Sequence, residues 1–376
     1  MTRTRLALLT LGDPTRVTGG YLFHRRLADR AHLHGMQIQF ISLPDVPLPW
    51  AMLSGPIWMR DPALQWADAL ILDSIAAAPA APWLAGVRVP ILGMLHQPPG
   101  GMDAGSVARS VRARLDRWAY RRAALLMVAS EWLAEQLAGA GVPRRRLVVV
   151  PPGKDPAPAE AATDGGVTFP RPDFRHGRRI AALCVANWLP RKGILDLLEA
   201  LAGLPDELVT LHLVGDAATG RYASRVRRRL AQPDLVGRVM VHGLIPASAV
   251  ARMYRGMDAF VLPSFEEPYG TVWGEAMAAG LPVVGWRAGN LPFLADDERE
   301  GLLAPVGDVA ALGRALERVA VEPDLREAMG QAARARAASR PTWDHTAERF
   351  FGVVAQVLDA APGSPPPPDQ RLSPEG

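Results

Sequence analysis

Short apolar runs of strand length alternate with longer segments of helical periodicity along most of the chain. In the first half, YLFHRRLADRAHLHG has the period of an amphipathic helix, and six runs have the composition of strands: RLALLTL, MQIQFISL, ADALILDS, VPILGMLH, AALLMVAS and RLVVVPPG. Alternation of this kind is typical of a parallel sheet whose strands are connected by crossover helices. The first half therefore predicts one doubly wound α/β domain.

A second series with the same alternation begins at Arg179. Its predicted strands are RIAALCVA, VTLHLVGD, RVMVHGL, AFVLPS, PVVGW and a run near GLLAPV. Its predicted helices are GILDLLEALAGL, YASRVRRRLAQ, SAVARMYRGM and GEAMAAG, and WDHTAERFFGVVAQVLDA after Thr342 predicts one more. Between Pro151 and Gly177, proline, alanine, glycine and charged residues replace the periodicity, which indicates a linker or a surface excursion.

These patterns predict an α/β protein with two Rossmann-like domains, each a doubly wound parallel sheet. A chain of 376 residues, 49% of them hydrophobic, is long enough for two cores. We expect a first domain at residues 1–155 with helix 343–360 packing back on it, a second domain at residues 156–342, and a disordered proline-rich tail at residues 361–376. Two such domains facing each other bind ligands in a cleft between the carboxyl ends of their strands.

Composition narrows the class of protein further. The apolar run in MTRTRLALLTLG is too short for a secretory signal and lacks a cleavage pattern, and no segment is long enough to span a bilayer. Cys184, the single cysteine, lies in an apolar run, which indicates a core residue in a reducing, cytoplasmic setting. The net charge of +4 comes from scattered arginines with few aromatics between them, which argues against nucleic acid and supports only a modest attraction to phosphates or anionic lipid.

The segment from Leu262 to Gly285, LPSFEEPYGTVWGEAMAAGLPVVG, carries the most informative pattern. We expect a strand that ends at Pro263, then a loop with two glutamates, then a helix that begins near Gly274 and Glu275. Because the first N–H groups of a helix lack partners within it, a helix start is a natural site for an anion.

The amides around Gly270, Thr271 and Val272 therefore form a candidate site for a phosphate or sugar oxygen, with Glu267 and Glu275 on either side of it. A carboxylate accepts hydrogen bonds from paired hydroxyls, so one glutamate suits a ribose and the other a hexose. The plainer alternative is that Glu275 is favoured by the helix dipole and that Glu267 is only solvated.

A second candidate lies in VANWLPRKGILDLLEAL, where a strand is expected to end at Asn187 and a loop to deliver Arg191 and Lys192 before the next helix. Lys154 and Lys192 are the only lysines in a chain that otherwise uses arginine. A compact ammonium group suits a point charge such as a β-phosphate. The alternative is a solvated cation near a helix start.

Two weaker candidates follow predicted strands of the first half. His96, in LHQPPGG, lies just past a strand end, which favours a role at the cleft, although a lone histidine is more often structural. Gly19 and Gly20 follow the first strand and permit a close approach of the backbone to a ligand. Many strand-to-helix turns carry glycine, so this signal is weak.

In order and spacing these motifs resemble those of the retaining nucleotide-sugar glycosyltransferases of family 4, which have the GT-B fold. The resemblance extends to about Ala360 and is most specific where the E-x7-E motif is followed by EAMAAGLPVV. The matching positions are Glu267 and Glu275 for E-x7-E, Arg191 to Gly193 for the RKG-type loop, Val214 to Asp216 for the V-G-D turn, and Gly19 and Gly20 for the amino-terminal double glycine.

The resemblance implies a role for each matching position and marks His96, Lys192 and Glu267 as catalytic. Glu275 would hold the ribose hydroxyls, Glu267 the donor sugar, Lys192 the diphosphate, and His96 a hydroxyl of the donor sugar near the reacting carbon. The other donor-binding positions it implies are Gly19, Gly20, Asn187, Arg191, Asp216, Gly243, Leu244, Tyr269, Gly270, Thr271 and Val272. Among these, the segment at Gly243 and Leu244 would lie along the base.

One position departs from the family pattern. The family usually has an arginine five residues before the loop lysine, where this chain has Asn187. An amide donates a hydrogen bond but carries no charge, so part of the leaving-group stabilisation must come from elsewhere, with Arg191 the nearest candidate, or be absent.

The resemblance also implies retention of the anomeric configuration, with the β-phosphate helping to deprotonate the acceptor. The chain contains no D-x-D and no histidine or cysteine cluster with metal spacing, so we expect neither a metal nor any other cofactor. The nucleotide-diphosphate sugar is the donor substrate. The patterns do not identify its base, its sugar or the acceptor, which is a saccharide, a lipid-linked saccharide or a small metabolite.

Other functions stay open at the level of sequence. The segment from Arg109 to Arg122 is rich in arginine with apolar residues between, which suits peripheral contact with an anionic membrane or, equally, a solvated helix face. A fold-mate such as a nucleotide-sugar epimerase or a phosphorylase-like enzyme would have the same cleft. A binding protein that has lost turnover is a third possibility, and Asn187 is the feature that keeps it open.

Overall fold

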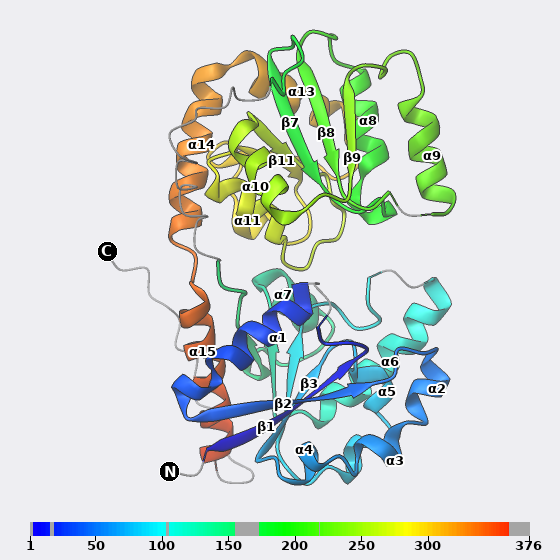
Figure 1. The fold of residues 1–376 in the computed structure, drawn as a ribbon, viewed down its shortest axis with the longest axis vertical. Coiled ribbons are helices and arrows are strands. Elements are labelled where there is room, and N and C mark those ends of the chain that lie inside the picture. The colour runs from blue at the N-terminus through cyan, green and yellow to red at the C-terminus, as the bar shows by residue number, and fades with distance from the viewer. Residues whose placement is uncertain (1–2, 16–18, 103–104, 155–172, 218, 361–376) are drawn as a thin grey trace. The chain divides into compact units, whose positions relative to one another are not determined.

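A computed structural model describes residues 3–15, 19–102, 105–154, 173–217 and 219–360 (Figure 1). The chain divides into two compact units, unit 1 with Met1–Lys154 and Pro341–Gly376 and unit 2 with Asp155–Arg340. Most of the predicted linker and all of the predicted tail lie outside the described residues. No helix in the described ranges combines the length and the apolar character that a bilayer crossing needs.

Unit 1 contains a six-stranded parallel sheet in the order β2-β1-β3-β4-β5-β6. Its strands are β1 (Thr4–Leu11), β2 (Met36–Leu43), β3 (Ala69–Asp73), β4 (Ile91–Leu95), β5 (Leu125–Val128) and β6 (Leu147–Val149). All residues of β3, β4 and β5 are buried, as expected for parallel strands that helices cover on both faces. The strand order reverses between β1 and β3, which makes that crevice the place where doubly wound sheets bind ligands.

Two apolar clusters cover the two faces of this sheet. One contains Phe23 and Leu27 of helix α1 (Gly19–Arg30) and Phe350 of α15 (Trp343–Asp359). The other contains Tyr120 of α6 (Ser106–Arg122) and Leu133 of α7 (Glu131–Gly139). The remaining short elements of the unit are α2 (Leu48–Met52), α3 (Gly55–Trp58), α4 (Pro62–Gln65), α5 (Ala77–Ala80), η1 (Ala31–His34), η2 (Leu84–Gly86) and η3 (Arg144–Arg146).

Helix α15 packs within unit 1 although it follows unit 2 in sequence. Thr342 caps its first turn through the backbone N–H of His345, and Thr346 Oγ1 donates to Pro151 O at 2.9 Å. The rings of Phe23 and Trp343 lie 5.8 Å apart. The amphipathic pattern after Thr342 thus forms a helix that completes one face of the first sheet.

Unit 2 contains a second six-stranded parallel sheet in the order β12-β11-β10-β7-β8-β9. Its strands are β7 (Ile180–Val185), β8 (Val209–Val214), β9 (Val239–Gly243), β10 (Ala259–Val261), β11 (Val283–Trp286) and β12 (Gly301–Ala304). Its helices are η4 (Pro190–Lys192), α8 (Ile194–Ala202), α9 (Arg221–Leu230), α10 (Ala247–Gly256), α11 (Thr271–Ala278), α12 (Leu291–Leu294), α13 (Val309–Val321) and α14 (Pro323–Ala338). The strand order reverses here between β7 and β10.

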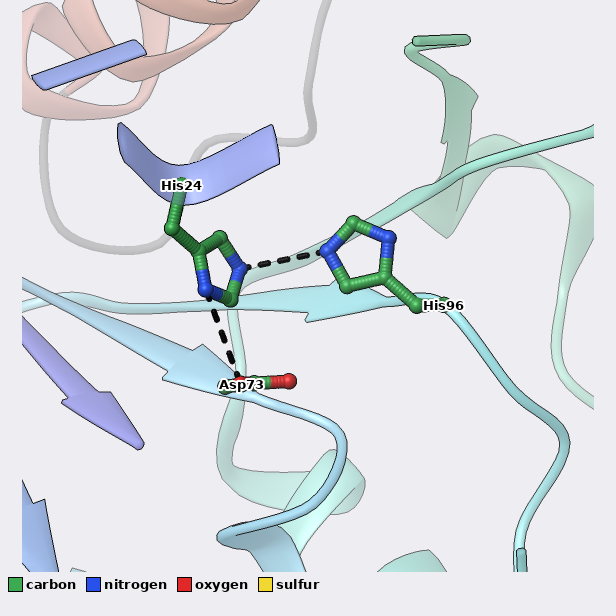
Figure 2. A group of neighbouring side chains, drawn as sticks. All are labelled: His24, Asp73 and His96. Carbon is green, nitrogen blue, oxygen red and sulfur yellow. Dashed lines mark hydrogen bonds and ion pairs between the residues drawn. The ribbon is translucent and has the colours of Figure 1, made fainter. Parts of the chain in front are cut away.

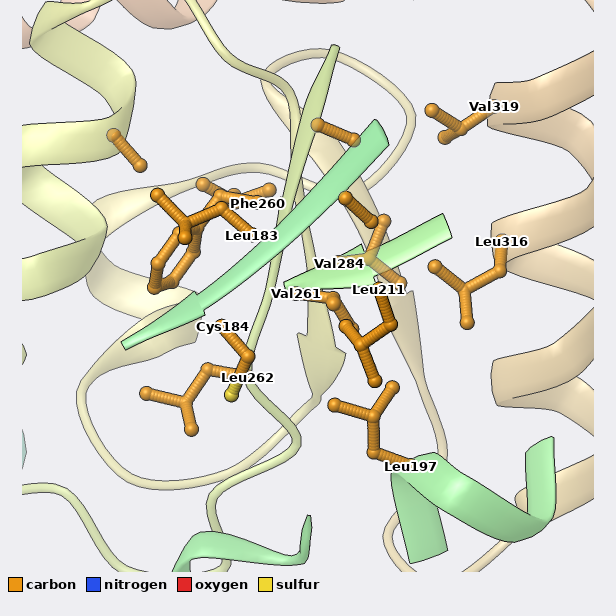
Figure 3. Close-up of a cluster of buried hydrophobic side chains, with 14 of the residues drawn as sticks. Leu183, Cys184, Leu197, Leu211, Phe260, Val261, Leu262, Val284, Leu316 and Val319 are labelled. Carbon is orange, nitrogen blue, oxygen red and sulfur yellow. The ribbon is translucent and has the colours of Figure 1, made fainter. Parts of the chain in front are cut away.

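The core of unit 2 includes Cys184, which is 1% exposed and lies among leucine and valine side chains (Figure 3). Burial raises the pKa of its thiol to about 12. At neutral pH the side chain is therefore a small apolar residue, in agreement with its interpretation from sequence.

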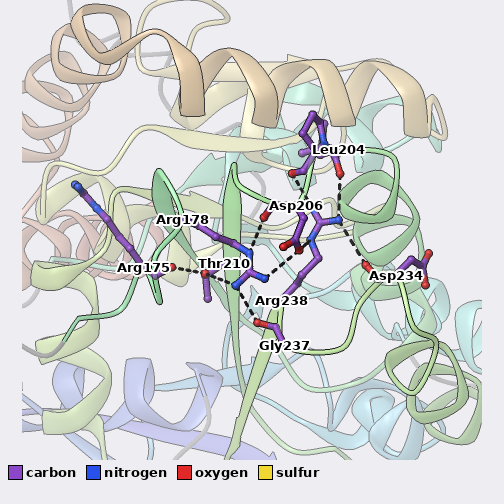
Figure 4. A network of polar contacts seen from close by, with 9 residues as sticks. Arg175, Arg178, Leu204, Asp206, Thr210, Asp234, Gly237 and Arg238 are labelled. Carbon is purple, nitrogen blue, oxygen red and sulfur yellow. Dashed lines mark hydrogen bonds and ion pairs between the residues drawn. The ribbon is translucent and has the colours of Figure 1, made fainter.

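Two arginines join the loops at the amino ends of β7, β8 and β9 (Figure 4). Arg178 Nη1 donates to Gly237 O at 2.9 Å and its Nε to Asp206 O at 2.6 Å, while Arg238 Nη1 donates to Leu204 O at 3.1 Å. Arg238 is buried, so its charge is used inside the protein. These arginines are structural and lie at the end of the sheet opposite the carboxyl ends of the strands.

The structure differs from the expected elements at several strand and helix ends and in helices that the sequence did not predict. The strand expected to end at Asn187 ends at Val185. The strand expected to end at Pro263 ends at Val261, and α11 begins at Thr271 rather than near Gly274 and Glu275, because Gly270 takes the left-handed conformation (φ 81°) at the N-cap. Helices α7, α13 and α14 were not predicted. The segment before β3 folds into the short helices α2 to α4, which begin with proline in their first turns and are too short for a periodic pattern.

Candidate donor site and histidine pair

Lys192 and Glu267 form an ion pair at the point where the strand order of unit 2 reverses. Lys192 ends η4, which follows β7, and Glu267 lies in the loop that follows β10. Arg191 adds a second positive charge, with its Nη1 3.8 Å from Glu267 Oε2. The Lys192 and Glu267 side chains are 12% and 15% exposed, so the pair is largely shielded from water.

Two glycines allow these loops to pack closely. Gly193 has φ 67°, and a Cβ on it would lie 2.1 Å from Pro263 O. Gly289 has φ 56°, and a Cβ on it would lie 2.8 Å from Glu267 N. The glycine of the RKG-type loop is therefore required by the fold, independently of any ligand.

Backbone hydrogen bonds hold the glutamate loop in place from two sides. The N–H of Phe265 and the hydroxyl of Ser264 both donate to Arg191 O, at 2.8 and 3.0 Å. On the other side, the N–H of Asn290 donates to Glu267 O at 2.9 Å. The loop that presents Glu267 is thus built into the unit.

The start of α11 supplies backbone donors close to this pair in sequence. The N–H groups of Trp273 and Gly274 both reach Gly270 O, at 3.1 and 3.3 Å. The N–H groups of Thr271 and Val272 precede these bonds and have no acceptor within the helix. The predicted anion site at residues 270 to 272 is therefore a true helix start, one turn earlier than the sequence pattern placed it.

Glu275 lies one turn into α11, is exposed and neighbours Tyr254 of α10. Burial, with a smaller contribution from the charge of Glu275, raises the pKa of the Tyr254 phenol well above its ordinary value. Tyr254 Oη also donates to Val272 O at 3.3 Å. This contact joins the first turn of α11 to α10 beside the carboxylate.

Tyr269 is engaged by the protein itself. Its hydroxyl contacts Arg340, whose guanidinium carbon lies 5.2 Å from the centre of the tyrosine ring, and its carbonyl accepts from Asn290 Nδ2 at 2.8 Å. The side chain predicted to bind the donor therefore packs within unit 2.

Asn187 and Asp216 connect the loops after β7 and β8. Asn187 Oδ1 accepts from Asp216 N at 3.1 Å, and Trp188 N donates to Asp216 O at 2.8 Å. Gly243 O accepts from Gly215 N at 2.9 Å, and the next residue, Leu244, is 76% exposed. Asn187 thus has a structural partner, while Leu244 offers an apolar surface beyond the carboxyl end of β9.

In unit 1 the predicted residue His96 lies just past β4, half-buried, beside the start of α1. A Cβ on Gly20 would lie 3.5 Å from His96 Cδ2, and a Cβ on Gly19 would meet nothing within 4 Å. Both glycines are the first residues of α1, whereas the sequence pattern suggested a turn before it. A side chain at position 20 would therefore make only an ordinary van der Waals contact with the His96 ring, so this approach does not require glycine.

The structure places two further ionisable groups beside His96 that sequence reasoning missed (Figure 2). His24 Nε2 lies 3.1 Å from His96 Nε2, and His24 Nδ1 lies 3.6 Å from Asp73 Oδ2. Burial lowers the pKa of each histidine to about 3 and raises that of Asp73. The two imidazoles are therefore neutral at physiological pH.

These three side chains are also of metal-ligating types, with ligand atoms within 4.8 Å of one another. The expectation that no such cluster exists came from spacing along the chain, and it overlooked residues that three separate elements bring together. His24 stands in α1, Asp73 ends β3 and His96 follows β4. Asp73 could have been identified from sequence as a candidate, because it is the polar last residue of an apolar strand run.

The arginines between Arg109 and Arg122 do not share one role. Arg112 Nη2 donates to Ile75 O at 2.7 Å, so this arginine anchors α6 to the loop after β3. The exposed face of the helix instead carries Val107, Val111 and Trp118, which are 77%, 51% and 40% exposed, with exposed Arg114 among them.

Comparison with protein families gives the class of protein. Residues 5–153 match the family model of the glycosyl transferase 4-like domain, and residues 170–336 match that of glycosyl transferases group 1. The two matches together span most of the chain and place it among the glycosyltransferases. Its two doubly wound sheets are those of the GT-B fold, as predicted.

Individual relatives agree with this class. The 2-deoxystreptamine glucosyltransferase of Streptomyces kanamyceticus is 28% identical over 281 residues, which are 73% of this chain and 66% of that protein. A D-inositol 3-phosphate glycosyltransferase of Xylanimonas cellulosilytica is 32% identical over 231 residues, 58% of this chain and 53% of that protein. The matched part thus spans about half to two thirds of the length of these two curated relatives.

Solved structures resemble the chain over nearly its whole length. Sucrose-phosphate synthase from Thermosynechococcus elongatus has a TM-score of 0.80 at 21% identity and covers 96% of this chain and 100% of its own. HepE of Anabaena, solved with UDP-glucose, has a TM-score of 0.72 at 20% identity and covers 93% of this chain and 99% of its own. At such identities the likeness is one of fold.

Proposed function

We propose that the protein transfers a hexose-type sugar from a nucleoside diphosphate to an acceptor hydroxyl, with retention of the anomeric configuration. The observation that carries the proposal is the gathering of Lys192 and Arg191 at the strand reversal of unit 2. Cleavage of the bond between the anomeric carbon and the diphosphate develops negative charge on the leaving group. Fixed cations and backbone N–H dipoles stabilise that charge without reorganisation.

The donor roles are assigned as follows. Lys192 binds the diphosphate together with the N–H groups of Thr271 and Val272, and Glu267 binds hydroxyls of the sugar. Glu275 binds the ribose, and the exposed Leu244 lies along the base.

The second charge on the leaving group comes from Arg191. Asn187 carries no charge and already accepts a hydrogen bond from Asp216. Arg191 approaches the same carboxylate as Lys192, so it is the nearest replacement for the arginine that the family usually has. Since these groups and the start of α11 supply the positive charge, we expect transfer to continue in the presence of a metal chelator.

The first donors to test are UDP-sugars, because a protein of the same fold was solved with UDP-glucose. The names of two relatives point to cyclitol acceptors, inositol phosphate and 2-deoxystreptamine, and these begin the acceptor panel. Saccharides and lipid-linked saccharides complete it. The anomeric proton of the product, followed by NMR, reports retention or inversion.

Variants test the site once a donor and an acceptor are known. Lys192→Ala and Glu275→Ala should each lower transfer by a factor of about 100 or more, because each removes a charge-assisted contact to the donor. Arg228→Ala, on the exposed side of α9, is the matched control and should keep full activity. Unchanged turnover in both site variants would exclude this donor site.

Other outcomes of the same assay discriminate the alternatives. Interconversion of a nucleotide sugar without any acceptor would indicate an epimerase. Tight binding of a nucleotide sugar with no transfer across the whole panel would indicate a binding protein.

We also propose that the exposed face of α6 contacts anionic membrane. Its exposed Val107, Val111 and Trp118 would enter the interface while Arg114 pairs with lipid phosphates. Co-sedimentation with vesicles that contain anionic lipid should weaken in Val107→Glu. Equal sedimentation with neutral and anionic vesicles would exclude this surface.

A further inference from the structure

His24 lies between Asp73 and His96 and directs a different ring nitrogen toward each of them (Figure 2). Its Nδ1 faces Asp73 Oδ2 at 3.6 Å, and its Nε2 faces His96 Nε2 at 3.1 Å. The line Asp73, His24, His96 runs along the carboxyl edge of the unit 1 sheet, beside the reversal between β1 and β3. His24 and Asp73 are almost fully buried, whereas His96 is partly exposed.

Asp73 is held in one orientation by its other contacts. Thr10 Oγ1 donates to Oδ2 at 2.7 Å, and the N–H of Ile75 donates to Oδ1 at 3.3 Å. The Ser74 hydroxyl reaches Oδ1 at 3.3 Å and also accepts from His96 N at 3.3 Å. The 3.6 Å between His24 Nδ1 and Asp73 Oδ2 is too long for a hydrogen bond, but the negative charge of the carboxylate favours the His24 tautomer that carries its proton on the facing nitrogen.

The position of the proton on His24 determines the position of the proton on His96. A neutral His24 with its proton on Nδ1 has a lone pair on Nε2, so His96 must donate from its own Nε2. A neutral His96 is then left with a lone pair on Nδ1. Within the described residues no protein group is hydrogen-bonded to this atom, so it is available to a ligand.

We propose that Asp73 and His24 are positioning residues that hold His96 in the Nε2–H tautomer, so that His96 Nδ1 accepts a hydrogen bond from a sugar hydroxyl of the substrate. The proposal rests on the proposed function and adds the direction of that hydrogen bond. If His96 Nδ1 carried a proton, it would donate a hydrogen bond to the oxygen of the sugar hydroxyl. As an acceptor, His96 Nδ1 instead directs the proton of that hydroxyl toward itself.

An aromatic ring helps to shield the buried part of this line from water. The Phe23 ring lies 4.8 Å from that of His96 and 6.0 Å from that of His24, edge-on to both. Trp343 of α15 also packs against Phe23. Water does not replace a lost partner at the buried His24 and Asp73, so the proton position on His24 depends on the protein groups alone.

A bound metal is a poorer explanation of the same geometry. Two histidine nitrogens at about 2.1 Å from a tetrahedral zinc ion lie about 3.4 Å apart, and further ligands must converge on the same point. Here the nitrogens are 3.1 Å apart, and Asp73 faces the opposite nitrogen of His24. The arrangement is that of a hydrogen-bonded histidine pair with a carboxylate beside its buried member.

Asp73→Asn tests the proposal, because it changes proton positions with little change in shape. The asparagine oxygen can keep the N–H of Ile75, which places its NH2 group toward Thr10 and His24. His24 Nδ1 then accepts, and His96 is forced into the Nδ1–H tautomer. Long-range ¹H–¹⁵N NMR of the histidine rings should show an unprotonated His96 Nδ1 in the native protein and a protonated one in the variant.

Kinetics connect this change to substrate. Asp73→Asn should lower kcat/KM for transfer about 10- to 100-fold, the effect of one hydrogen bond lost and one group left unpaired. Combined with His96→Ala, it should add no further loss, because Asp73 acts through His96. Asp29→Asn, on the exposed side of α1, is the matched control and should change neither tautomer nor rate.

The outcomes are distinct from those that test the donor site. Nucleoside diphosphate affinity should be the same in Asp73→Asn and in the native protein. A native His96 with its proton on Nδ1, or a tautomer that Asp73→Asn does not change, would overturn the proposal even if transfer is confirmed. Stoichiometric zinc binding that His24→Ala abolishes would overturn it as well, whereas a failure to transfer any sugar would leave the tautomer measurement valid and reject the proposed function alone.

Discussion

Replacing Glu267 with glutamine should tighten the binding of a nucleoside diphosphate while slowing sugar transfer. Without a ligand, the ammonium group of Lys192 is in contact with the Glu267 carboxylate, so an incoming phosphate must compete with that carboxylate for the same charge. Glutamine has nearly the same shape but no charge. It therefore leaves Lys192 free for the diphosphate and removes a repelling charge.

The size of the effect follows from the burial of the pair. Two unit charges about 4 Å apart attract by about 4 kcal/mol at an effective dielectric constant of about 20, and most of this is offset by the cost of removing both groups from water. With side chains 12% and 15% exposed, a net value of about 1 kcal/mol is reasonable, which corresponds to about fivefold in affinity. Loss of a charged acceptor for the sugar hydroxyls should lower transfer by at least about tenfold.

Isothermal titration with a nucleoside diphosphate measures the first effect, and initial rates of transfer measure the second. Glu266→Gln, the neighbouring glutamate, is the control and should change neither by more than about twofold. Lys192→Met should weaken nucleotide binding whichever residue stands at 267. An affinity for the diphosphate that stays equal or falls in Glu267→Gln would refute the competition, because Lys192 would then bind phosphate without leaving the glutamate.

Two further predictions concern stability. Gly193→Ala puts a methyl group 2.1 Å from Pro263 O at φ 67°, so it should lower the free energy of unfolding by about 2 to 4 kcal/mol in chemical denaturation. Gly203→Ala is the control, because Gly203 has φ −74° and the nearest neighbour of an added Cβ lies at 3.6 Å, so this variant should stay within about 1 kcal/mol of the native protein. Equal losses in the two variants would reject the close approach at Gly193. Burial raises the pKa of Asp116, which accepts from Gly100 N at 2.7 Å, to about 6. Between about pH 4 and 6 the folded protein then binds more protons than the unfolded chain. Ionisation of Asp116 therefore lowers the free energy of unfolding by up to about 3 kcal/mol as the pH rises through that range. Asp116→Asn should remove that loss, so its stability relative to the native protein should be higher at pH 7 than at pH 4.5, and a pH-independent difference would contradict the raised pKa.

The fold was accessible from sequence because buried parallel strands are short apolar runs separated by helical periods. The strand-end residues Arg191, Lys192 and Glu267 were accessible for the same reason: each follows such a run, and neighbouring parallel strands place their carboxyl ends at one edge. The contact between Lys192 and Glu267 could not be predicted from sequence. It depends on β7 and β10 being neighbouring strands, and no local pattern in the sequence gives the order of strands in a sheet.

The histidine pair of His24 and His96 shows a second limit of prediction from sequence. His96 was found because it follows a strand, but His24 faces inward from α1 and its pattern is that of an ordinary core position. Only the packing of α1 over β3 and β4 brings His24 between Asp73 and His96. For Asn187 and Tyr269 the sequence suggested contacts with the donor, whereas the structure gives them partners within the protein. Asn187 is hydrogen-bonded to Asp216, and Tyr269 contacts Arg340. The spacing of residues along the chain does not reveal these tertiary contacts.

A structure of the protein with a bound nucleoside diphosphate tests the donor site most directly. We expect its β-phosphate within hydrogen-bonding distance of Lys192 Nζ and of the N–H groups of Thr271 and Val272, with Glu267 displaced from the ammonium group. A diphosphate bound at any other strand end, with Lys192 still in contact with Glu267, would contradict the assignment.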